Sequence, residues 1–432
     1  MYYTFWDYLK ISSVKYSMKV ILKINRGVIM KKKYGILVIV LIFFLAGFVV
    51  KLINRFYSFD YLYNTLIKRE FAANPRVEVD IAKDYQIRIW YYPFYRTIKE
   101  KDEKEFFREV LQGIRKNYPG IGFKVRELSF ANGYQELLAA VQGGKAPDIY
   151  FNFSNDTNID SRWQIPVDPY ISEEERMGFH TVDWREIDAG KRLWGWPFLV
   201  QEQGWIKNGR TEKVSYLNKI ADLESIEKKG LIFNYYDLTL LKQLLALYGV
   251  ERLIVDNGRA DEETINILEK VFELCHQMRG RGIFAVSPDE MPGYFLKYPF
   301  ENGAAMLGPV NPYMEYFLMN RNDDFHKIRV GNLIQVFTIN IFRQKRYKGD
   351  DHSRAVMEVA RAISQEYAEK MAGEIGIKPA YSKTDSNYRK ILEIYPEERE
   401  YWDRVITPTW LSFWEKDLSP EEAGELINKL DK

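Results

Sequence analysis

Residues 132–152, NGYQELLAAVQGGKAPDIYFN, decide the fold of this chain. Leu137 and Val141 are spaced so that they fall on one face of a helix. Gly143-Gly144 ends that helix, because glycine adopts the left-handed backbone conformation at little cost. The run 148–151, DIYF, then predicts a buried strand with Asn152 at its carboxyl end. Ligands of open α/β sheets bind just beyond such strand ends, so the stretch predicts an α/β fold and a candidate site.

The same alternation of strand and helix patterns extends on both sides of this stretch. Strands are predicted at 86–90, 123–128, 231–234 and 333–341, and helices at 103–116, 133–141, 238–248, 261–278 and 353–372. A strand–helix–strand–helix–strand order is typical of a doubly wound α/β sheet.

Three further stretches occur in a recognisable order with the first. They are Gln86–Trp90 followed by YYP, Arg192–Phe198 closing on WIKN at 205–208, and Phe300–Met306 followed by Gly308-Pro309. A weaker similarity is Gly376–Ala380, GIKPA. Together these stretches resemble the extracellular solute-binding proteins of ABC importers, in the family 1 cluster that includes maltose-binding protein.

This resemblance implies a type II periplasmic-binding-protein fold. We expect two doubly wound α/β lobes with a ligand cleft between them and two or more hinge crossings, one of them near Val200–Gly204. One continuous sheet would contradict this arrangement. The expected parts are a cytoplasmic segment at 1–33, a transmembrane signal anchor at 34–53, a stalk at 54–84, lobe 1 at 85–200 and 333–385, and lobe 2 at 201–332 and 386–432.

The N-terminal region predicts a membrane segment. A lysine triplet at 31–33 precedes the uncharged apolar run 34–50, long enough to cross a bilayer as a helix. The triplet should remain cytoplasmic, which places the rest of the chain outside the cell at the membrane. Lipid-anchored members of the family carry LAGC, whereas this chain reads LAGF and has Phe48 in place of the cysteine. We therefore expect an uncleaved anchor, with a cleaved signal peptide as the alternative.

Composition limits the kinds of function open to the chain. A net charge of +2 over 432 residues argues against a surface that coats nucleic acid. A single cysteine, Cys275, excludes an intramolecular disulfide and a cysteine zinc cluster. The four histidines form no zinc-binding pair, and neither a nucleophile elbow nor a phosphate loop occurs. We expect no metal, no cofactor and no enzymatic activity.

The resemblance, together with the predicted strand ends, also indicates candidate ligand-binding residues. They are Tyr92 and Phe94 after the first strand, Asn152 and Asn155 after the strand at 148–151, Gln201 and Glu202 in the crossing, Asn311 and Tyr313 after the Gly-Pro pair, and Trp410 and Trp414 on one helix face. Aromatic rings stack on sugar faces and amides bond hydroxyl groups, and 15% of the residues are aromatic. The alternative for each residue is an ordinary place in the core or on the surface.

These expectations lead to one principal function and one alternative. The resemblance implies a monomeric, membrane-anchored, extracellular protein that captures a carbohydrate between two lobes and delivers it to ABC permease subunits. Since a fold does not determine a function, a solute sensor or a glycoside-active enzyme on the same scaffold is the alternative.

Overall fold

The computed structural model comprises two compact units, Met1–Arg69 and Glu70–Lys432. It describes residues 32–68, 71–92, 103–129, 132–152, 159–208, 216–224, 226, 231–233, 235, 238–250, 253, 255–256, 259–286, 306–309, 325–369, 377–382, 389–390 and 396–430.

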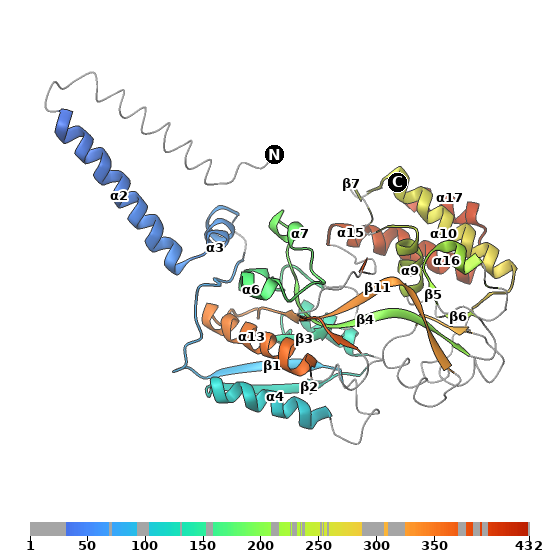
Figure 1. Cartoon of the computed structure of the whole chain (residues 1–432), viewed down its shortest axis with the longest axis horizontal. Coiled ribbons are helices and arrows are strands. Elements are labelled where there is room, and N and C mark those ends of the chain that lie inside the picture. The colour runs from blue at the N-terminus through green and yellow to red at the C-terminus, as the bar shows by residue number, and fades with distance from the viewer. Residues whose placement is uncertain are drawn as a thin grey trace. The chain divides into compact units, whose positions relative to one another are not determined.

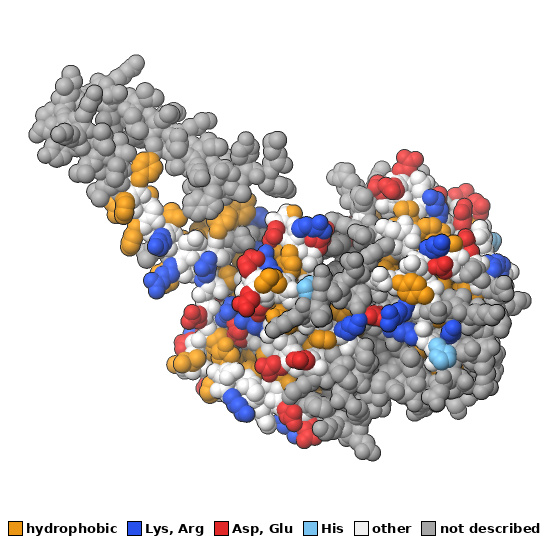
Figure 2. Space-filling view, viewed as in Figure 1, with side chains coloured by type: hydrophobic (Ala, Val, Ile, Leu, Met, Phe, Trp, Pro, Cys, Tyr) orange, Lys and Arg blue, Asp and Glu red, His pale blue; other side chains and the backbone are white. Residues whose placement is uncertain are grey.

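The described part of the N-terminal unit, residues 32–68, is helical. Its elements are α2 (Lys32–Phe56), α3 (Phe59–Leu62) and the π-helix η1 (Tyr63–Lys68). Large apolar side chains on α2 are exposed, among them Phe44 at 79% and Phe48 at 62%, and they appear as orange side chains in Figure 2. Among the described residues, no helix combines the length and the apolar character that crossing a membrane requires.

The second unit is built on one large mixed sheet, with strand order β2-β1-β3-β11-β4-β10-β6-β9. Its principal strands are β1 (Tyr85–Tyr91), β2 (Ile121–Glu127), β3 (Ile149–Asn152), β4 (Gly195–Asn208), β6 (Leu231–Phe233), β9 (Phe284–Val286), β10 (Met306–Leu307) and β11 (Phe325–Ile341). Strands β2, β1 and β3 are parallel to one another, as are β10, β6 and β9. The antiparallel pair β4 and β11 lies between these two parallel groups and runs across the body in Figure 1.

Short strands and the helices complete this unit. The short strands are β5 (Tyr216–Leu217), β12 (Lys378–Pro379) and β13 (Arg389–Lys390), with β7 (Val255–Asp256) and β8 (Arg259–Ala260) forming a separate ribbon. The helices are α4 (Glu103–Asn117), α5 (Gly133–Gln142), η2 (Asp168–Tyr170), α6 (Glu173–Arg176), α7 (Trp184–Asp188), α8 (Ile220–Glu224), α9 (Thr239–Leu247), α10 (Glu262–Gly280), α13 (Asp350–Ala362), η4 (Ile363–Tyr367), α15 (Pro396–Tyr401), η5 (Trp402–Ile406), α16 (Thr407–Glu415) and α17 (Pro420–Leu430).

Two separate hydrophobic cores lie along this sheet. The first core is formed by side chains from β1, β3, α4 and α13, and the second by side chains from α9, α10, α16 and α17. Both cores contain residues of the long strands: β4 contributes Trp196, Phe198 and Leu199 to the first core and Trp205 to the second. The strand therefore passes from one core to the other between Leu199 and Trp205, and this interval includes Val200–Gly204.

The crossing is marked by an irregularity in the β4–β11 ladder. The register shifts between Arg329, which pairs with Gly204, and Ile334, which pairs with Glu202. Gly331 lies inside this bulge with φ of +55°, a left-handed conformation that favours glycine. A bulge bends its strand, so β11 changes direction where the two long strands leave one core for the other.

Several sequence expectations about the elements are confirmed, and one about the sheet is wrong. The predicted strands and helices around 132–152 occur as β1, α4, β2, α5 and β3. We expected two separate sheets, and this prediction is wrong. The strands β4 and β11, of 14 and 17 residues, form one hydrogen-bond ladder that passes through both cores and makes the sheet continuous. The strand predicted at 333–341 begins at Phe325, since its polar first half still pairs with β4.

Candidate functional site

The carboxyl end of β3 supplies Asn152. It pairs in register with Thr338 on β11 and is only 1% exposed. Thr338 Oγ1 donates to Asn340 Oδ1 at 3.1 Å, so polar side chains occur at this strand end and on the neighbouring long strand. The predicted strand end therefore adjoins the pair of strands that cross between the cores.

A row of glutamines occupies the crossing itself. Gln201 on β4 pairs in register with Gln335 on β11, and Gln203 follows two residues later on the same face of β4. Gln203 Nε2 donates to Gln335 Oε1 at 3.4 Å. Gln201 and Gln203 are 3% and 2% exposed, so β4 buries two amides at the crossing.

The glutamine row continues into the second core as a hydrogen-bonded chain. Trp205 Nε1 donates to Gln243 Oε1 at 2.8 Å, and Gln243 Nε2 donates to Gln203 Oε1 at 2.9 Å. Gln243 lies on α9 and is fully buried. Because buried amides are stable only when they are hydrogen-bonded, this chain fixes the orientation of Gln203 and, through it, of Gln335. We call Gln201, Gln203, Gln335 and Gln243 the amide row.

Glu202 is held in an ion-pair network instead of in the amide row. Its carboxylate lies 2.7 Å from Lys378 Nζ and 3.3 Å from Arg329 Nε, and Lys327 Nζ donates to its backbone oxygen at 2.9 Å. Residues 201 and 202 point to opposite faces of β4, because side chains alternate along a strand. The network joins β4, β11 and β12 on the face opposite Gln201, so Glu202 links these three strands at the crossing.

Tyr92 lies in a small apolar cluster beside α5. Its hydroxyl is 3.2 Å from that of Tyr150, its side chain is 7% exposed, and it packs on Leu137 and Val141 of α5. An added Cβ on Gly133 would approach Tyr92 Cε1 to 2.8 Å, which explains the glycine at the start of that helix. Burial raises the pKa of Tyr92 above its usual value, so the phenol is neutral. The described geometry presents Tyr92 as part of the core.

Trp410 and Trp414 also lie in the core. Trp410 is 0% exposed and its Nε1 donates to the Tyr235 carbonyl at 2.9 Å. The Trp414 ring centroid is 4.8 Å from that of Phe233, and the Arg279 guanidinium lies 5.5 Å from the same ring. Residues four apart share one face of α16, and that face is the one packed into the second core. The placement of both rings does not support the prediction that they stack on a ligand.

The remaining predicted site residues are Phe94, Asn155, Asn311 and Tyr313, and they lie outside the described residues. Sequence reasoning missed Gln203, Gln335 and Gln243. A usable signal existed for one of them, because Gln201 and Gln203 alternate directly after the apolar run 196–200, and amides that continue the buried face of a strand need partners.

Gly308, from the Gly-Pro pair noted in the sequence, packs against the ring of Trp205. A Cβ at position 308 would lie 2.2 Å from Trp205 Cδ1, so only glycine allows the backbone to approach the indole this closely. The Gly-Pro stretch thereby holds the first member of the hydrogen-bonded chain that ends in the amide row. Among the described residues, no group of acidic, histidine or cysteine side chains is placed to hold a metal ion.

Comparison with known proteins identifies the architecture. No family model matches the chain, and no curated protein matches it in sequence. The chain superimposes on the maltose/maltodextrin-binding domain from Bdellovibrio bacteriovorus bound to maltotriose, with 17% identity, 80% of this chain and 98% of that one covered, and a TM-score of 0.55.

Two other solved structures give the same result. An ABC substrate-binding protein from Listeria monocytogenes in complex with cycloalternan matches with 14% identity, coverage of 81% and 98%, and a TM-score of 0.58. The sugar-binding protein from Xanthomonas citri matches with 15% identity, coverage of 80% and 96%, and a TM-score of 0.58. The resemblance seen in the sequence is thus confirmed at the level of the fold: this chain has the type II periplasmic-binding-protein fold.

Proposed function

We propose that this chain is a solute-binding protein that captures a carbohydrate at the crossing between its two cores and delivers it to an ABC importer. The observation that carries the proposal is the part of the amide row on β4 and β11, namely Gln201, Gln203 and Gln335, at the place where the chain passes between the cores. A glutamine amide donates and accepts, and so can bond the hydroxyl groups of a sugar in either sense. The named ligands of similar folds, maltotriose and cycloalternan, support this ligand class.

The position of the amide row also suggests how binding changes the conformation. A ligand that bonds side chains beside the bulge at Gly331 contacts the strands that connect both cores. It favours whichever arrangement of the lobes gives it the most contacts, and shifts the population toward that state. The Glu202 network on the opposite face of β4 keeps the two strands together while they bend.

We further propose that α2 anchors the chain at the outer face of the cell membrane. The apolar run at 34–50 and the exposed apolar side chains of α2 support this. Extraction of native membranes tests it: an anchored chain resists carbonate and high salt and is released by detergent. Recovery in the soluble fraction, or a mature N-terminus near residue 47, would contradict the anchor.

A thermal-shift and calorimetric screen of the full chain tests the binding function. Maltotriose and cycloalternan come first, followed by other saccharides, amino acids and polyamines. Gln203→Ala should weaken saccharide binding about 3- to 10-fold, the equivalent of one lost hydrogen bond, whereas Gln277→Ala on the exposed side of α10 should not change it. Recovered saccharide should be chemically intact. Binding confined to amino acids or polyamines, or cleavage of the saccharide, would refute the proposal.

A further inference from the structure

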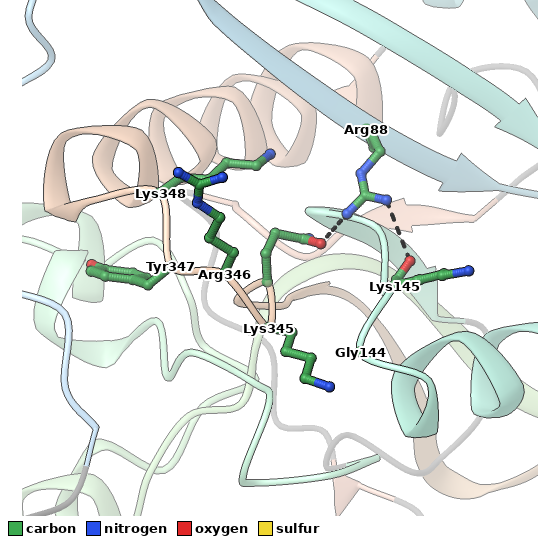
Figure 3. Close-up of a pocket in the computed structure, with 8 residues that line it drawn as sticks. Arg88, Gly144, Lys145, Lys345, Arg346, Tyr347 and Lys348 are labelled. Atoms are coloured by element: carbon green, nitrogen blue, oxygen red, sulfur yellow. Dashed lines mark hydrogen bonds between the residues drawn. The ribbon is translucent and has the colours of Figure 1, made fainter.

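A pocket lies at the amino end of β3 and beside the middle of β1, whereas Asn152 lies at the carboxyl end of β3. Its volume is about 670 Å³, and it is lined by Arg88, Gly144, Lys145, Gln344, Lys345, Arg346, Tyr347 and Lys348. Figure 3 shows Arg88 on β1 facing the turn at Gly144 and Lys145, with the loop 344–348 on the other side. We call it the basic pocket.

The charge of the basic pocket is strongly one-sided. Five of its residues are Lys or Arg, and none is Asp or Glu. Asp148 lies beneath it, 1% exposed, and contacts Lys348 at 3.1 Å and Arg88 at 3.7 Å. Within the described part of the chain, Lys145, Lys345 and Arg346 have no acidic partner, and all three are exposed. Three cations therefore face solvent without a counter-charge from any residue that the structure describes.

The walls of the basic pocket are held in place. Arg88 donates to the Ala146 carbonyl at 2.6 Å and to Gln344 Oε1, and Gln344 Nε2 donates to Asp148 Oδ1 at 3.1 Å. Gly144 has φ of +66°, and a Cβ there would lie 3.0 Å from the Lys345 side chain, so the two loops are in close contact. Burial disfavours the charge of Asp148, but its hydrogen bond to His352 and the nearby Lys348 outweigh this and keep its pKa below the usual value. The carboxylate thus remains ionised and fixes Arg88 and Lys348.

The first residues of the second unit dock at the edge of this pocket. The Phe71 ring meets the Tyr347 ring edge-on at 5.0 Å, and the Arg343 guanidinium lies 4.2 Å from the Phe71 ring. Asn74 N–H donates to Asp350 Oδ1 at 3.1 Å, and Lys83 Nζ pairs with Asp351 at 2.7 Å. Residues 57–70 join α2 to Phe71, and because α3 and η1 make part of this stretch helical, it spans less than the roughly 50 Å that a fully extended stretch of that length would reach. An anchor at α2 would therefore hold the basic pocket within reach of the membrane surface.

We infer that the basic pocket binds the phosphate group of an anionic lipid in the membrane to which the chain is tethered. Ammonium and guanidinium groups bind phosphate by charge-assisted hydrogen bonds. Each exposed basic residue near an anionic bilayer adds to the free energy with which a protein binds that bilayer. The inference rests on the proposed membrane anchor and is separate from sugar binding. Its consequence is an oriented body, because a pocket on one lobe that binds the bilayer fixes which face points to the membrane.

The test uses the full chain in nanodiscs of phosphatidylcholine, with or without phosphatidylglycerol. Incorporation into the discs reports on the anchor alone. Amide hydrogen exchange of segments 143–147 and 343–349 then reports on the pocket, and phosphatidylglycerol should slow it at least about ten-fold. The triple variant Lys145→Gln, Lys345→Gln, Arg346→Gln should exchange at the rate seen in phosphatidylcholine alone.

A matched variant controls for the loss of three charges. Lys116→Gln, Lys124→Gln, Lys416→Gln removes three exposed lysines that have no ion pair among the described residues and lie outside the pocket, and it should keep the protection. Inorganic phosphate added to phosphatidylcholine discs separates the two sources of the anion. Equal protection by inorganic phosphate, no protection by phosphatidylglycerol, or protection that survives in the triple variant would overturn the assignment to a lipid.

Discussion

The variant Trp410→Ala distinguishes between two roles of this residue, packing in the core and stacking on a ligand. The sequence pattern suggested stacking on a sugar, whereas the ring is 0% exposed and lies between Phe272 and Trp414, at centroid distances of 6.2 and 5.5 Å. Its Nε1 donates to the Tyr235 carbonyl, which joins α16 to the segment after β6. Removal of the ring should therefore act on the second core and not on the ligand.

The expected magnitude follows from these contacts. Replacing a fully buried Trp or Phe with Ala costs about 3–5 kcal/mol of unfolding free energy, including the cavity that remains. The Tyr235 carbonyl also loses its donor, which costs about 1 kcal/mol. Since the two effects overlap, we expect a loss of about 4–5 kcal/mol. Trp410→Phe keeps most of the packing and should cost about 1–2 kcal/mol.

The assay pairs urea unfolding of each variant with calorimetric titration of the saccharide that the screen identifies. Unfolding is followed by far-ultraviolet circular dichroism, because fluorescence would change with the tryptophan itself. Trp410→Phe should keep the affinity of the wild-type chain within about two-fold. An affinity lowered more than about ten-fold in Trp410→Phe, with unfolding free energy within about 0.5 kcal/mol of wild type, would refute the core placement and restore the stacking role.

Three further variants test the crossing and the basic pocket. Gly308→Ala should push Trp205 out of place, cost about 1–3 kcal/mol by urea unfolding and weaken saccharide binding, whereas an unchanged protein would show that position 308 is not tightly packed. Glu202→Gln removes the charge that holds Lys378 and Arg329, and should cost about 1 kcal/mol or less because those partners are largely exposed; a larger loss would mean that the network carries the crossing. Asp148 has a lowered pKa in the folded state, so its stabilisation is present above its unfolded pKa of about 3.9 and is lost as the pH falls through the folded value. Asp148→Asn should therefore flatten the acid side of the stability–pH curve and cost about 3 kcal/mol at pH 7, and an unchanged acid limb would contradict this.

Local patterns predicted the first parallel group of strands well, because helix and strand periods there agree with the turns between them. The helix of residues 133–142 and the strand after it follow from apolar spacing, paired glycines and Pro147. The continuous sheet could not be predicted in this way. It depends on two strands, more than 100 residues apart in sequence, that pair along most of their length, and neither carries a local signal for its partner.

The candidate site was only partly predictable for a related reason. Gln201 was selected by its place in the crossing, but its partner Gln335 lies on the other long strand and the supporting Gln243 on a helix. A hydrogen-bonded chain among residues distant in sequence becomes visible only in three dimensions. Asn152 could be placed at a strand end because a strand end is a local property, whereas the burial of Trp410 could not be predicted because four-residue spacing marks a helix face without saying what that face meets.

The places of the tryptophans in the structure explain why the high aromatic content suggested rings that stack on a sugar. Trp196, Trp205, Trp402 and Trp410 are all fully buried, and they are divided between the two cores. A body with two cores on one sheet needs large side chains to fill each of them, so a high aromatic content follows from the architecture without any ligand. In the described part of the crossing, the groups suited to a sugar are amides fixed by such a tryptophan. The indole of Trp205 thus fixes Gln203 through Gln243, and in the proposed site it would orient the hydrogen bonds that a ligand meets.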